Sequence, residues 1–454
     1  MSQPRVAIVG GGITGAAAAA ELSKSGLISV TVFDQGRRGP GGRASHRRVA
    51  KDGHAVLADD AALAGDDAST FEFDHGCQFL RADDAAMQEL VADWCAQGWA
   101  APWEGRFGCL KGSGAAAGET TGDFFGLPGS PAPVYTGVGG MHRLPRAILA
   151  GCKEGTTSVQ RGVRVAGLVQ NVEGWTLLGT EGAAAFHDTP EAQAAGVEPS
   201  ALAEPFDAVL MTDVSSSFGG WHRAGAGLPE EFAARVRDRV RVPLFSCMVA
   251  FEAPLTLPLD GVTVDGDAAL WFAARSQSKA GMPTGAAECW TLVSTPGFAV
   301  AEITETPMQD ASGAFVPQSD DYLNTVPGPA LLAAFAAAVA PSRGGAELPR
   351  AVYLQGQRWG SAMPAPAGVG GRDTLGRGDT TSQVLGVEYE SAVPPLLFEA
   401  PAGSDEFVAD DGRRLYYAGD YCSRRNPGFE AAALSGLAAA QHIRAVVLGS
   451  RPRS

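Results

Sequence analysis

The chain has 454 residues, of which 45% are hydrophobic and 19% are charged. This apolar content excludes a disordered polymer, and the length predicts two or three structural lobes. The 50 acidic and 35 basic residues give a formal net charge of -15, which repels nucleic-acid phosphates and anionic membranes. We therefore expect a globular protein whose partner is a small molecule and not a nucleic acid.

The first strand-like run, VAIV at 6–9, leads directly into a G-x-G-x-x-G pattern formed by Gly10, Gly12 and Gly15. A helical pattern begins at 16. In this order the first glycine permits a tight turn, the second lets a pyrophosphate approach the backbone, and the third packs the helix on the sheet. A second strand, 30–33, ends in Asp34, whose carboxylate can accept hydrogen bonds from ribose hydroxyls. The segment predicts a Rossmann-type unit that binds FAD or NAD.

A second set of phosphate-facing features distinguishes these two cofactors. In RGPGGRAS, Gly41 and Gly42 offer backbone N–H groups and Arg43 offers a fixed cation. Near the C-terminus, LYYAGD reads as a strand followed by Asp420, and a helix is expected to start around Pro427. The N-terminus of such a helix favours an anion. Together these features favour FAD over an NAD-dependent dehydrogenase without flavin.

The remaining chain alternates strand-like and helical patterns. The runs VAIV, VTVF, AVLMT and LYYAG predict a parallel α/β sheet. The segment 83–97 predicts an amphipathic helix with Trp94 in the core. The run ALLAAFAAAVA at 330–340 is about half of the roughly 20 residues that a membrane span requires, so it predicts a buried helix. Segments rich in alanine, glycine and proline at 112–122, 181–205 and 364–381 are predicted to be surface insertions.

The seven cysteines include no C-x-x-C pair, and the seven histidines show no paired spacing. We therefore expect no metal site, and the cysteine usage suits a reducing compartment. No signal-peptide pattern and no integral membrane segment are recognised. The visible sequence predicts a soluble, cytoplasmic protein; a plastid location stays open because a transit peptide could have been removed.

Six motifs, in this order along nearly the whole chain, resemble the renalase-like branch of the flavin amine oxidase superfamily, above all its members from photosynthetic organisms. They are GGGITG with Asp34, GPGGR, FDHGCQF at 73–79, GVGGMHRLPRAI at 137–148, QRWGSAMPA at 357–365, and AGDYC followed by PGFEAAALSGLAAA. The resemblance implies an α/β flavoprotein with a Rossmann-type FAD-binding domain formed by 1–80, 135–214 and 385–448. It also implies a substrate domain with an antiparallel sheet and helices, formed by 81–134 and 215–384.

The resemblance also assigns residues to a non-covalently bound FAD. They are Gly10, Gly12, Ile13, Thr14, Gly15, Asp34, Gln35, Gly41, Gly42, Arg43, Gly76, Val165, Gly419, Asp420, Gly428 and Phe429. Val165 has an equal claim to be a plain core residue. The candidates for the substrate side of the flavin are Trp359, Gln78, Phe79 and Met141, each of which has core packing as its alternative role. His75 and His142 have structural and functional interpretations of equal weight, and Cys422 is the one plausible point of covalent attachment.

One departure from the family pattern bears on the reaction. Amine-oxidising members carry a lysine near the flavin, in a strand that corresponds here to 240–255, and this strand contains no lysine. We therefore expect an FAD-dependent oxidoreductase that takes a hydride from a donor such as a dihydronicotinamide-type ring, with oxygen or another acceptor reoxidising the flavin. Two alternatives stay open, which are a flavin amine oxidase and an FAD-binding scaffold protein without turnover.

Overall fold

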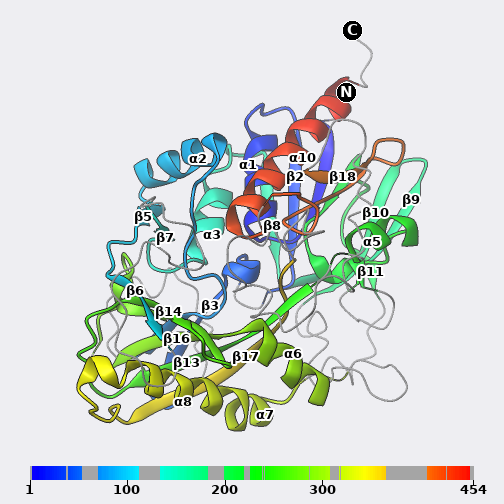
Figure 1. Cartoon of the computed structure of the whole chain (residues 1–454). Helices are drawn as coiled ribbons and strands as arrows, with labels where there is room; N and C mark the ends of the chain where they lie inside the picture. Colours follow the sequence, from blue (N-terminus) through cyan, green and yellow to red (C-terminus); the bar gives the residue numbers. More distant parts are fainter. Residues whose placement is uncertain are drawn as a thin grey trace.

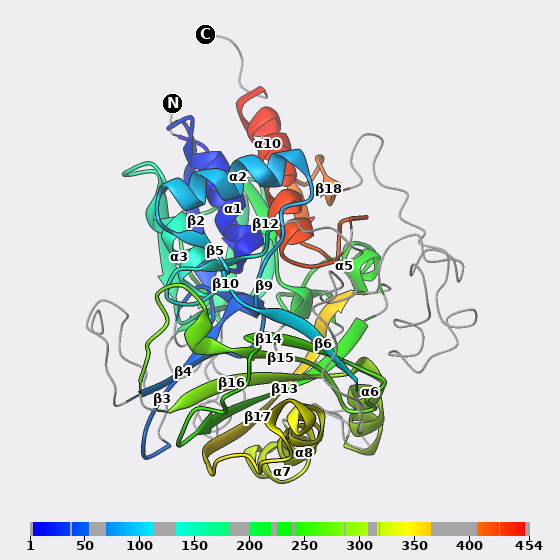
Figure 2. The same cartoon turned by 60° about the vertical axis from the view of Figure 1, so that its left-hand side comes forward.

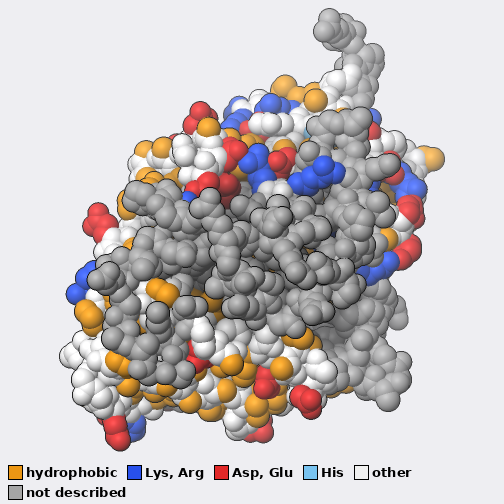
Figure 3. All heavy atoms as spheres, in the orientation of Figure 1, with side chains coloured by type: hydrophobic (Ala, Val, Ile, Leu, Met, Phe, Trp, Pro, Cys, Tyr) orange, Lys and Arg blue, Asp and Glu red, His pale blue; other side chains and the backbone are white. Residues whose placement is uncertain are grey.

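The computed structural model describes residues 3–36, 39–53, 70–111, 133–181, 199–218, 225–237, 239, 241–285, 287–306, 316, 318–364, 406–425 and 427–449. Two sheet-based lobes lie one above the other in the view of Figure 1. The insertions predicted at 112–122, 181–205 and 364–381 lie wholly or mostly outside the described residues. In the part of the surface that Figure 3 describes, acidic and basic side chains are mixed.

The first lobe is built on a six-stranded sheet with the order β18-β19-β12-β1-β2-β8. Its parallel strands are β1 (Arg5–Val9), β2 (Ser29–Asp34), β8 (Thr157–Arg161), β12 (Ala208–Met211) and β19 (Leu415–Ala418). The edge strand β18 (Phe407–Asp410) pairs antiparallel with β19. The central strands are apolar on both faces, as parallel strands covered on both sides require. The predicted parallel α/β sheet is confirmed.

Helices cover one face of this sheet. They are α1 (Ile13–Ser23), α2 (Ala85–Ala96), α3 (Arg143–Ala150) and α10 (Phe429–Gly449), whose apolar residues form one core with the sheet (Figure 1). The long helix α10 crosses α1 closely at Gly436, where a Cβ atom would lie 2.2 Å from the carbonyl oxygen of Thr14. This contact holds the C-terminal helix directly over the glycine-rich turn of the N-terminal segment.

A second, smaller sheet covers the other face of the central sheet. It contains β9 (Val163–Asn171), β10 (Gly174–Glu181) and β11 (Ser200–Ala201). Trp175 of β10 and Phe33 of β2 belong to the core between the two sheets, and α5 (Glu230–Arg237) adds Phe232 to it. The first lobe therefore has three layers, with helices, the parallel sheet and the small sheet in that order.

The second lobe is built on another six-stranded sheet, with the order β17-β13-β16-β15-β14-β6. The strands are β6 (Phe107–Lys111), β13 (Arg241–Phe251), β14 (Gly261–Asp265), β15 (Leu270–Arg275), β16 (Glu288–Ser294) and β17 (Ala351–Pro364). All neighbours pair antiparallel except β6 and β14. The helices α6 (Pro296–Glu305), α7 (Asp320–Thr325) and α8 (Pro327–Val339) lie on one side of it (Figure 2). The expected antiparallel sheet with helices is confirmed.

The run 330–340 forms most of α8, as predicted. Leu331 and Phe335 are fully buried and pack with Trp290 of the second sheet. By length and composition alone, Asp320–Val339 and Phe429–Gly449 could each cross a membrane, a test that core helices of globular proteins also pass. Both helices contribute buried residues to the lobe cores, and the absence of a membrane segment stays a prediction.

The short elements connect the two lobes. The ribbon of β3 (His46–Ala50) and β4 (Thr70–Asp74) packs Phe71 and Phe73 against Met248 of β13, on the side of the second sheet away from its helices. The strands β5 (Ala100–Pro102) and β7 (Tyr135–Gly137) form a separate pair. The short 3-10 turns are η1 (Gly42–Ala44), η4 (Val214–Ser217), η5 (Ser276–Ser278) and η6 (Pro341–Arg343).

The packing departs from the expected domain boundary at residue 81. Met87, Val91 and Trp94 of α2 are buried in the same core as α1 and α10, which also bears out Trp94 as a core residue. The sequence motifs could not reveal this, because the apolar face of an amphipathic helix does not identify its partner. We propose that α2 be counted with the first lobe, and α5 as well, because its Phe232 packs in the core of that lobe.

Candidate functional site

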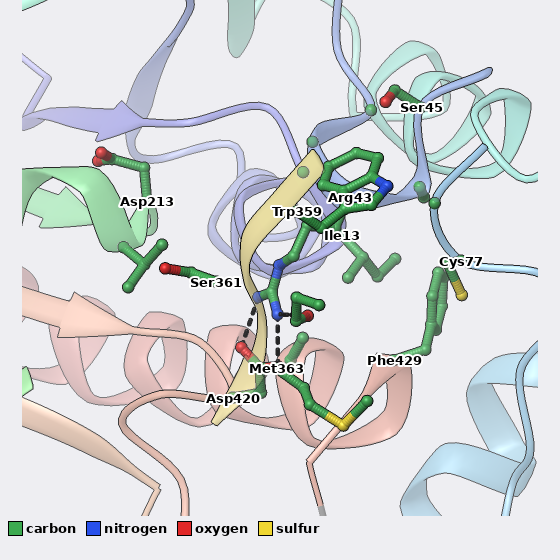
Figure 4. A pocket seen from close by; sticks show the side chains of 18 of the residues that line it. Ile13, Arg43, Ser45, Cys77, Asp213, Trp359, Ser361, Met363, Asp420 and Phe429 are labelled. Carbon is green, nitrogen blue, oxygen red and sulfur yellow. Dashed lines mark hydrogen bonds and ion pairs between the residues drawn. The ribbon is translucent and has the colours of Figure 1, made fainter. Parts of the chain in front are cut away.

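A cavity of about 1830 Å³ opens where the two lobes meet, and residues of both lobes line it. On the first lobe it lies beyond the carboxyl ends of β1, β2 and β12, the edge at which open α/β sheets bind their ligands. On the second lobe it is bounded by β13, β15, β16 and the edge strand β17. Figure 4 shows side chains from both lobes that line this space.

The three glycines of the N-terminal motif have three different surroundings. Gly10 has a φ of +110°, and a Cβ atom there would lie 2.4 Å from Oγ1 of Thr212. A Cβ atom at Gly15 would lie 2.0 Å from the carbonyl oxygen of Gly10. At Gly12 the nearest described atom is Cα of Gly42, 3.8 Å away. A Cβ atom at Gly12 would therefore make one ordinary van der Waals contact, and Gly12 lines the cavity between two glycine loops, as a backbone cradle for a phosphate requires.

Asp34 is held at the edge of this cradle. Its Oδ2 accepts a hydrogen bond from the backbone N–H of Gly11 at 2.8 Å, and its Oδ1 accepts one from Gly36 at 2.9 Å. Burial raises the pKa of Asp34, and the two hydrogen bonds work against this shift. Each carboxylate oxygen keeps further acceptor capacity, which the predicted bond to a ribose hydroxyl would use. Gln35 and Val165 line the same end of the cavity.

A second carboxylate at this end escaped the sequence reasoning. Asp213 follows β12, lines the cavity, and accepts a hydrogen bond from the backbone N–H of Ser216 at 2.9 Å. Burial raises the pKa of Asp213 to about 6; its hydrogen bonds with Ser216 oppose the shift and the nearby Asp34 carboxylate adds to it. The sequence could have indicated Asp213, because this residue directly follows a buried strand of the same parallel sheet and so lies at the same edge of the sheet as Asp34.

Arg43 and Asp420 meet at the centre of the cavity (Figure 4). The guanidinium donates from Nη1 to Oδ2 at 2.7 Å and from Nη2 to Oδ1 at 2.5 Å, and Nη1 also donates to the carbonyl oxygen of Ala362 at 2.9 Å. Burial alone would lower the pKa of Arg43, yet the Asp420 carboxylate raises it above its usual value. The structure thus joins the two predicted phosphate-facing segments through one bidentate ion pair.

Most of the predicted cofactor residues line the cavity. They are Gly10, Gly12, Ile13, Thr14, Asp34, Gln35, Gly41, Gly42, Arg43, Gly76, Val165, Asp420, Gly428 and Phe429. Gly15 and Gly419 do not line it and lie behind its wall. Gly419 donates its backbone N–H to Oγ of Ser435 in α10 at 2.8 Å and so helps to fix the neighbouring Asp420.

Trp359 of β17 forms a fixed wall of the cavity. Its Nε1 donates to the carbonyl oxygen of His75 at 3.0 Å and to Oγ of Ser246 at 3.2 Å. The indole and the His75 ring are stacked with centroids 5.3 Å apart. A Cβ atom at Gly76 would lie 2.1 Å from the carbonyl oxygen of Arg43 and 3.1 Å from the Trp359 ring, so only glycine fits there. Phe79 lines the cavity beside this wall.

Gln78 also lines the cavity, but its amide is directed into the protein. Nε2 donates to the carbonyl oxygens of Asp74 and Gly76 at 2.5 and 2.9 Å, and Oε1 accepts from Nζ of Lys279 at 3.0 Å. With these bonds made, the amide shapes the loop that carries Phe79 and does not present a polar group to a substrate. This differs from the expected substrate-facing role of Gln78.

This network contains a buried lysine, Lys279, that no sequence motif marked as part of the site. Nζ of Lys279 pairs with Oδ2 of Asp74 at 2.9 Å, and both side chains are almost completely buried. As expected, β13 contains no lysine, and no lysine is among the described residues that line the cavity. Lys279 lies behind Gln78, so it stabilises the cavity wall from within.

One further expectation for this wall is corrected, that for Met141. Met141 is fully buried, and its Sδ accepts the backbone N–H of Gly137 at 3.3 Å. It is not a lining residue, so the expectation that it faces a flavin is wrong. His142 is buried with its ring stacked on that of His46 and does not line the cavity, whereas His75 does.

The thiols near the cavity also differ from expectation. Cys422 is buried and is not among the described residues that line the cavity. Cys77 does line it, and its Sγ donates to the carbonyl oxygen of Phe79 at 3.0 Å. Burial, with the Asp74 carboxylate in addition, raises the pKa of Cys77 to about 11. A protonated thiol is a poor nucleophile, so this cysteine is ill suited to form a covalent bond with a ligand.

Comparison with known proteins agrees with this geometry. Residues 8–94 match the family description "NAD(P)-binding Rossmann-like domain". No curated protein matches the sequence. The matched segment contains the glycine motif and Asp34, so the first lobe has a Rossmann-like dinucleotide-binding domain.

Solved structures resemble the whole chain. A candidate protoporphyrinogen oxidase from Exiguobacterium sp. 255-15 is 13% identical, with a TM-score of 0.55 and coverage of 98% of this chain and 99% of that chain. A reduced UDP-galactopyranose mutase is 13% identical, with a TM-score of 0.54 and coverage of 99% and 96%. A putrescine oxidase with a redesigned cofactor site is 13% identical, with a TM-score of 0.50 and coverage of 97% and 98%. At this level of identity the likeness establishes the two-lobed fold.

Proposed function

We propose that the protein is an FAD-dependent oxidoreductase of the renalase-like type. It would accept a hydride from a small organic donor, such as a dihydronicotinamide-type ring, and oxygen or another acceptor would reoxidise the flavin. The observation that carries this proposal is that Gly12 and Gly42, on two glycine loops, line the same cavity as the Trp359 wall of the second lobe. The part of the cavity at the glycine loops would suit either a nicotinamide dinucleotide or FAD. The cavity continues to the second lobe, which favours FAD, whose ring system would extend that far.

The lining residues fit such a cofactor. Gly12 and Gly42 would receive the pyrophosphate, and Asp34 the ribose. The N-terminus of α10, at Gly428 and Phe429, faces the cavity, where its partial positive charge favours an anionic group. When bound, FAD would supply the two-electron acceptor, and the chain would supply position and electrostatics.

The protein side of the cavity favours donors that need no deprotonation. Within the described lining no lysine faces the space, and the carboxylates that do face it come from the first lobe. A dihydronicotinamide releases a hydride without first losing a proton, whereas a protonated amine does not. Trp359 is fixed by two hydrogen bonds and offers a flat ring against which a donor ring can stack.

The fold likeness to a putrescine oxidase keeps a flavin amine oxidase as the second candidate. An anaerobic screen decides between the two. FAD-loaded protein is mixed without oxygen with dihydronicotinamides or with simple primary amines, and flavin absorbance is followed. We expect bleaching by at least one dihydronicotinamide and none by amines. Bleaching by amines alone would favour the amine oxidase, and no bleaching by any donor would favour a scaffold protein.

A further inference from the structure

Charged side chains are divided unequally between the two halves of the cavity. The lining carboxylates are those of Asp34, Asp83, Asp84, Asp213, Asp420 and Glu430, all from the first lobe or the segments that pack with it. Among the described residues, the strands and helices of the second lobe add no carboxylate to the lining. They add Arg241, and Arg358 lines the cavity from the helix side of β17, where it bonds to Thr306 and Gln318. Arg47 of the β3–β4 ribbon also lines the cavity. The half of the cavity that would receive a substrate is therefore basic, in a protein whose net charge is -15.

The arginines of the first half already have carboxylate partners. Arg43 pairs with Asp420, and Arg425 pairs with both Asp84 and Glu406. These cations are neutralised inside the protein and do not require a ligand for that purpose.

Arg47 has no such partner within the described chain. Its one hydrogen bond runs from Nη2 to Oε1 of Gln357 at 3.3 Å, and its Nε is buried without a hydrogen-bond partner. Guanidinium groups that are half withdrawn from water are normally balanced by an anion, because desolvating an unpaired charge is costly. A neutral amide 3.3 Å away does not provide that balance.

The register of β17 places this cation beside Trp359. Gln357 and Trp359 are two residues apart, so their side chains lie on the same face of the strand. Arg358, between them, points to the other face, where its Nη1 donates to the carbonyl oxygen of Thr306 and to Oε1 of Gln318, both at 3.2 Å. Arg47 therefore lies at the face of β17 that carries the Trp359 indole, and Arg358, which has the same charge, lies at the opposite face of this strand.

We propose that the cavity binds a donor carrying a carboxylate or phosphate group, which Arg47 recognises together with Gln357 while the donor ring lies against Trp359. This inference rests on the proposed function, because it names the substrate class of the same site. The guanidinium would donate to the anionic oxygens, and Gln357 would hold it on the Trp359 side of the strand. A cationic amine would meet the same arginine as a repelling charge.

Calorimetric titration of FAD-saturated protein tests this directly, with FAD blocking anion binding at the dinucleotide site. The probes are benzoate, phenyl phosphate and the neutral benzamide, which share a flat ring. We expect one or both anionic probes to bind at least about tenfold more tightly than benzamide, the effect of one charge-assisted hydrogen bond. Their relative affinities separate a carboxylate from a phosphate donor. Equal binding of all three probes would overturn the proposal.

The variants locate the effect. Arg47→Gln should weaken the anionic probe about tenfold or more and leave benzamide within about twofold, whereas Arg358→Gln should change neither by more than about twofold. Arg47→Lys keeps the charge and should retain the preference for anions, which guards against a merely misfolded Arg47→Gln protein. An anion preference that survives Arg47→Gln, or that is lost only in Arg358→Gln, would contradict the assignment. FAD content is measured separately, so failure of the cofactor proposal is distinguishable from failure of this one.

Discussion

Arg43 and Asp420 lie 377 positions apart in the chain and form a bidentate ion pair in the middle of the cavity, with Nη1 to Oδ2 at 2.7 Å and Nη2 to Oδ1 at 2.5 Å. The Asp420 side chain is 1% exposed, whereas that of Arg43 remains 35% exposed. The buried carboxylate thereby fixes the direction of a cation that still reaches the open space. The pair also ties the loop after β2 to the segment before α10, so the two ends of the dinucleotide site form one unit.

Replacement of Arg43 should weaken cofactor binding. We expect Arg43→Ala to lose about tenfold to hundredfold in FAD affinity, because a charge-assisted hydrogen bond contributes about 1.5–3 kcal/mol and Asp420 is left buried without its partner. Titration of apoprotein with FAD measures the change. Arg413→Ala, which breaks an exposed pair with Glu231 far from the lining, is the control and should leave the dissociation constant unchanged. Equal dissociation constants for Arg43→Ala and wild type would remove Arg43 from the site.

Substitutions at Gly12 and Gly15 should have different effects, the first on FAD binding and the second on folding. Gly12→Val adds a Cβ atom that would meet only Cα of Gly42, at an ordinary contact distance of 3.8 Å, so the protein should fold with a nearly unchanged melting temperature but lose detectable FAD binding. Gly15→Val places Cβ 2.0 Å from the carbonyl oxygen of Gly10, so it should lower the melting temperature strongly or prevent folding. Thermal denaturation and flavin absorbance of the purified variants measure both effects. Normal FAD content in Gly12→Val would show that the cofactor lies elsewhere.

Trp359 should affect reduction more than cofactor content. Trp359→Ala removes the flat wall and one of the two donors to the carbonyl oxygen of His75, which keeps its bond from Oγ of Ser246. Anaerobic reduction of the flavin by a dihydronicotinamide should therefore slow about tenfold or more while bound FAD stays the same. Trp359→Phe retains a ring but not the N–H donor and should recover part of the rate. Rapid-mixing absorbance measures both variants. An unchanged rate in Trp359→Ala would place the donor away from this wall.

Asp213 should make stability depend on pH. Its pKa of about 6 in the folded protein lies above the ordinary 3.8, so the folded form holds a proton between these values that the unfolded chain has released. Stability should therefore fall as pH rises through this window and become level above it. The Asp213 side chain is half-buried at the cavity. We therefore expect the free energy of unfolding to fall by about 1–3 kcal/mol across this window, which is at most the free energy that corresponds to the whole pKa shift.

The Asp213→Asn variant tests that expectation in apoprotein. Denaturant unfolding is measured at several pH values, and the stability of wild type relative to the variant should decline from pH 3.8 to about 6. Ser216→Ala removes the hydrogen bonds from Oγ of Ser216 that favour the ionised form and keeps the one from its backbone N–H, so the decline should extend to higher pH. A difference between wild type and Asp213→Asn that does not vary with pH would refute the shift.

Features formed by residues that are close in the sequence were predictable, whereas features formed by contacts between distant segments were not. Gly10, Gly12 and Asp34 were recognisable because the turn, the strand ends and the helix are local and adjacent in the chain. The cavity wall that the second lobe contributes was not recognisable from the sequence. Lys279 reaches Gln78 across 201 positions, and Arg47 reaches Gln357 across 310, so no local pattern marks either contact.

Orientation was a second obstacle. Gln78 and Met141 lie in motifs that adjoin the cavity, and both were expected to face it. Whether a loop side chain turns inward depends on partners such as Lys279 that arrive from the other lobe. Our proposal to count α2 with the first lobe has the same origin, because the core that receives Trp94 is formed by α1 and α10, far away in the sequence.

The central claim is that the cavity holds FAD without a covalent bond, and acid precipitation of protein purified with added FAD tests it most directly. We predict that the precipitate is colourless and that the supernatant contains about one FAD per chain, identified by its absorbance and chromatography. Burial raises the pKa of the Cys77 thiol to about 11, which disfavours the nucleophilic thiolate, and Cys422 does not line the cavity. Colour that remains in the precipitate would contradict the non-covalent claim. A supernatant that contains a nicotinamide dinucleotide and no flavin would contradict the proposed cofactor itself.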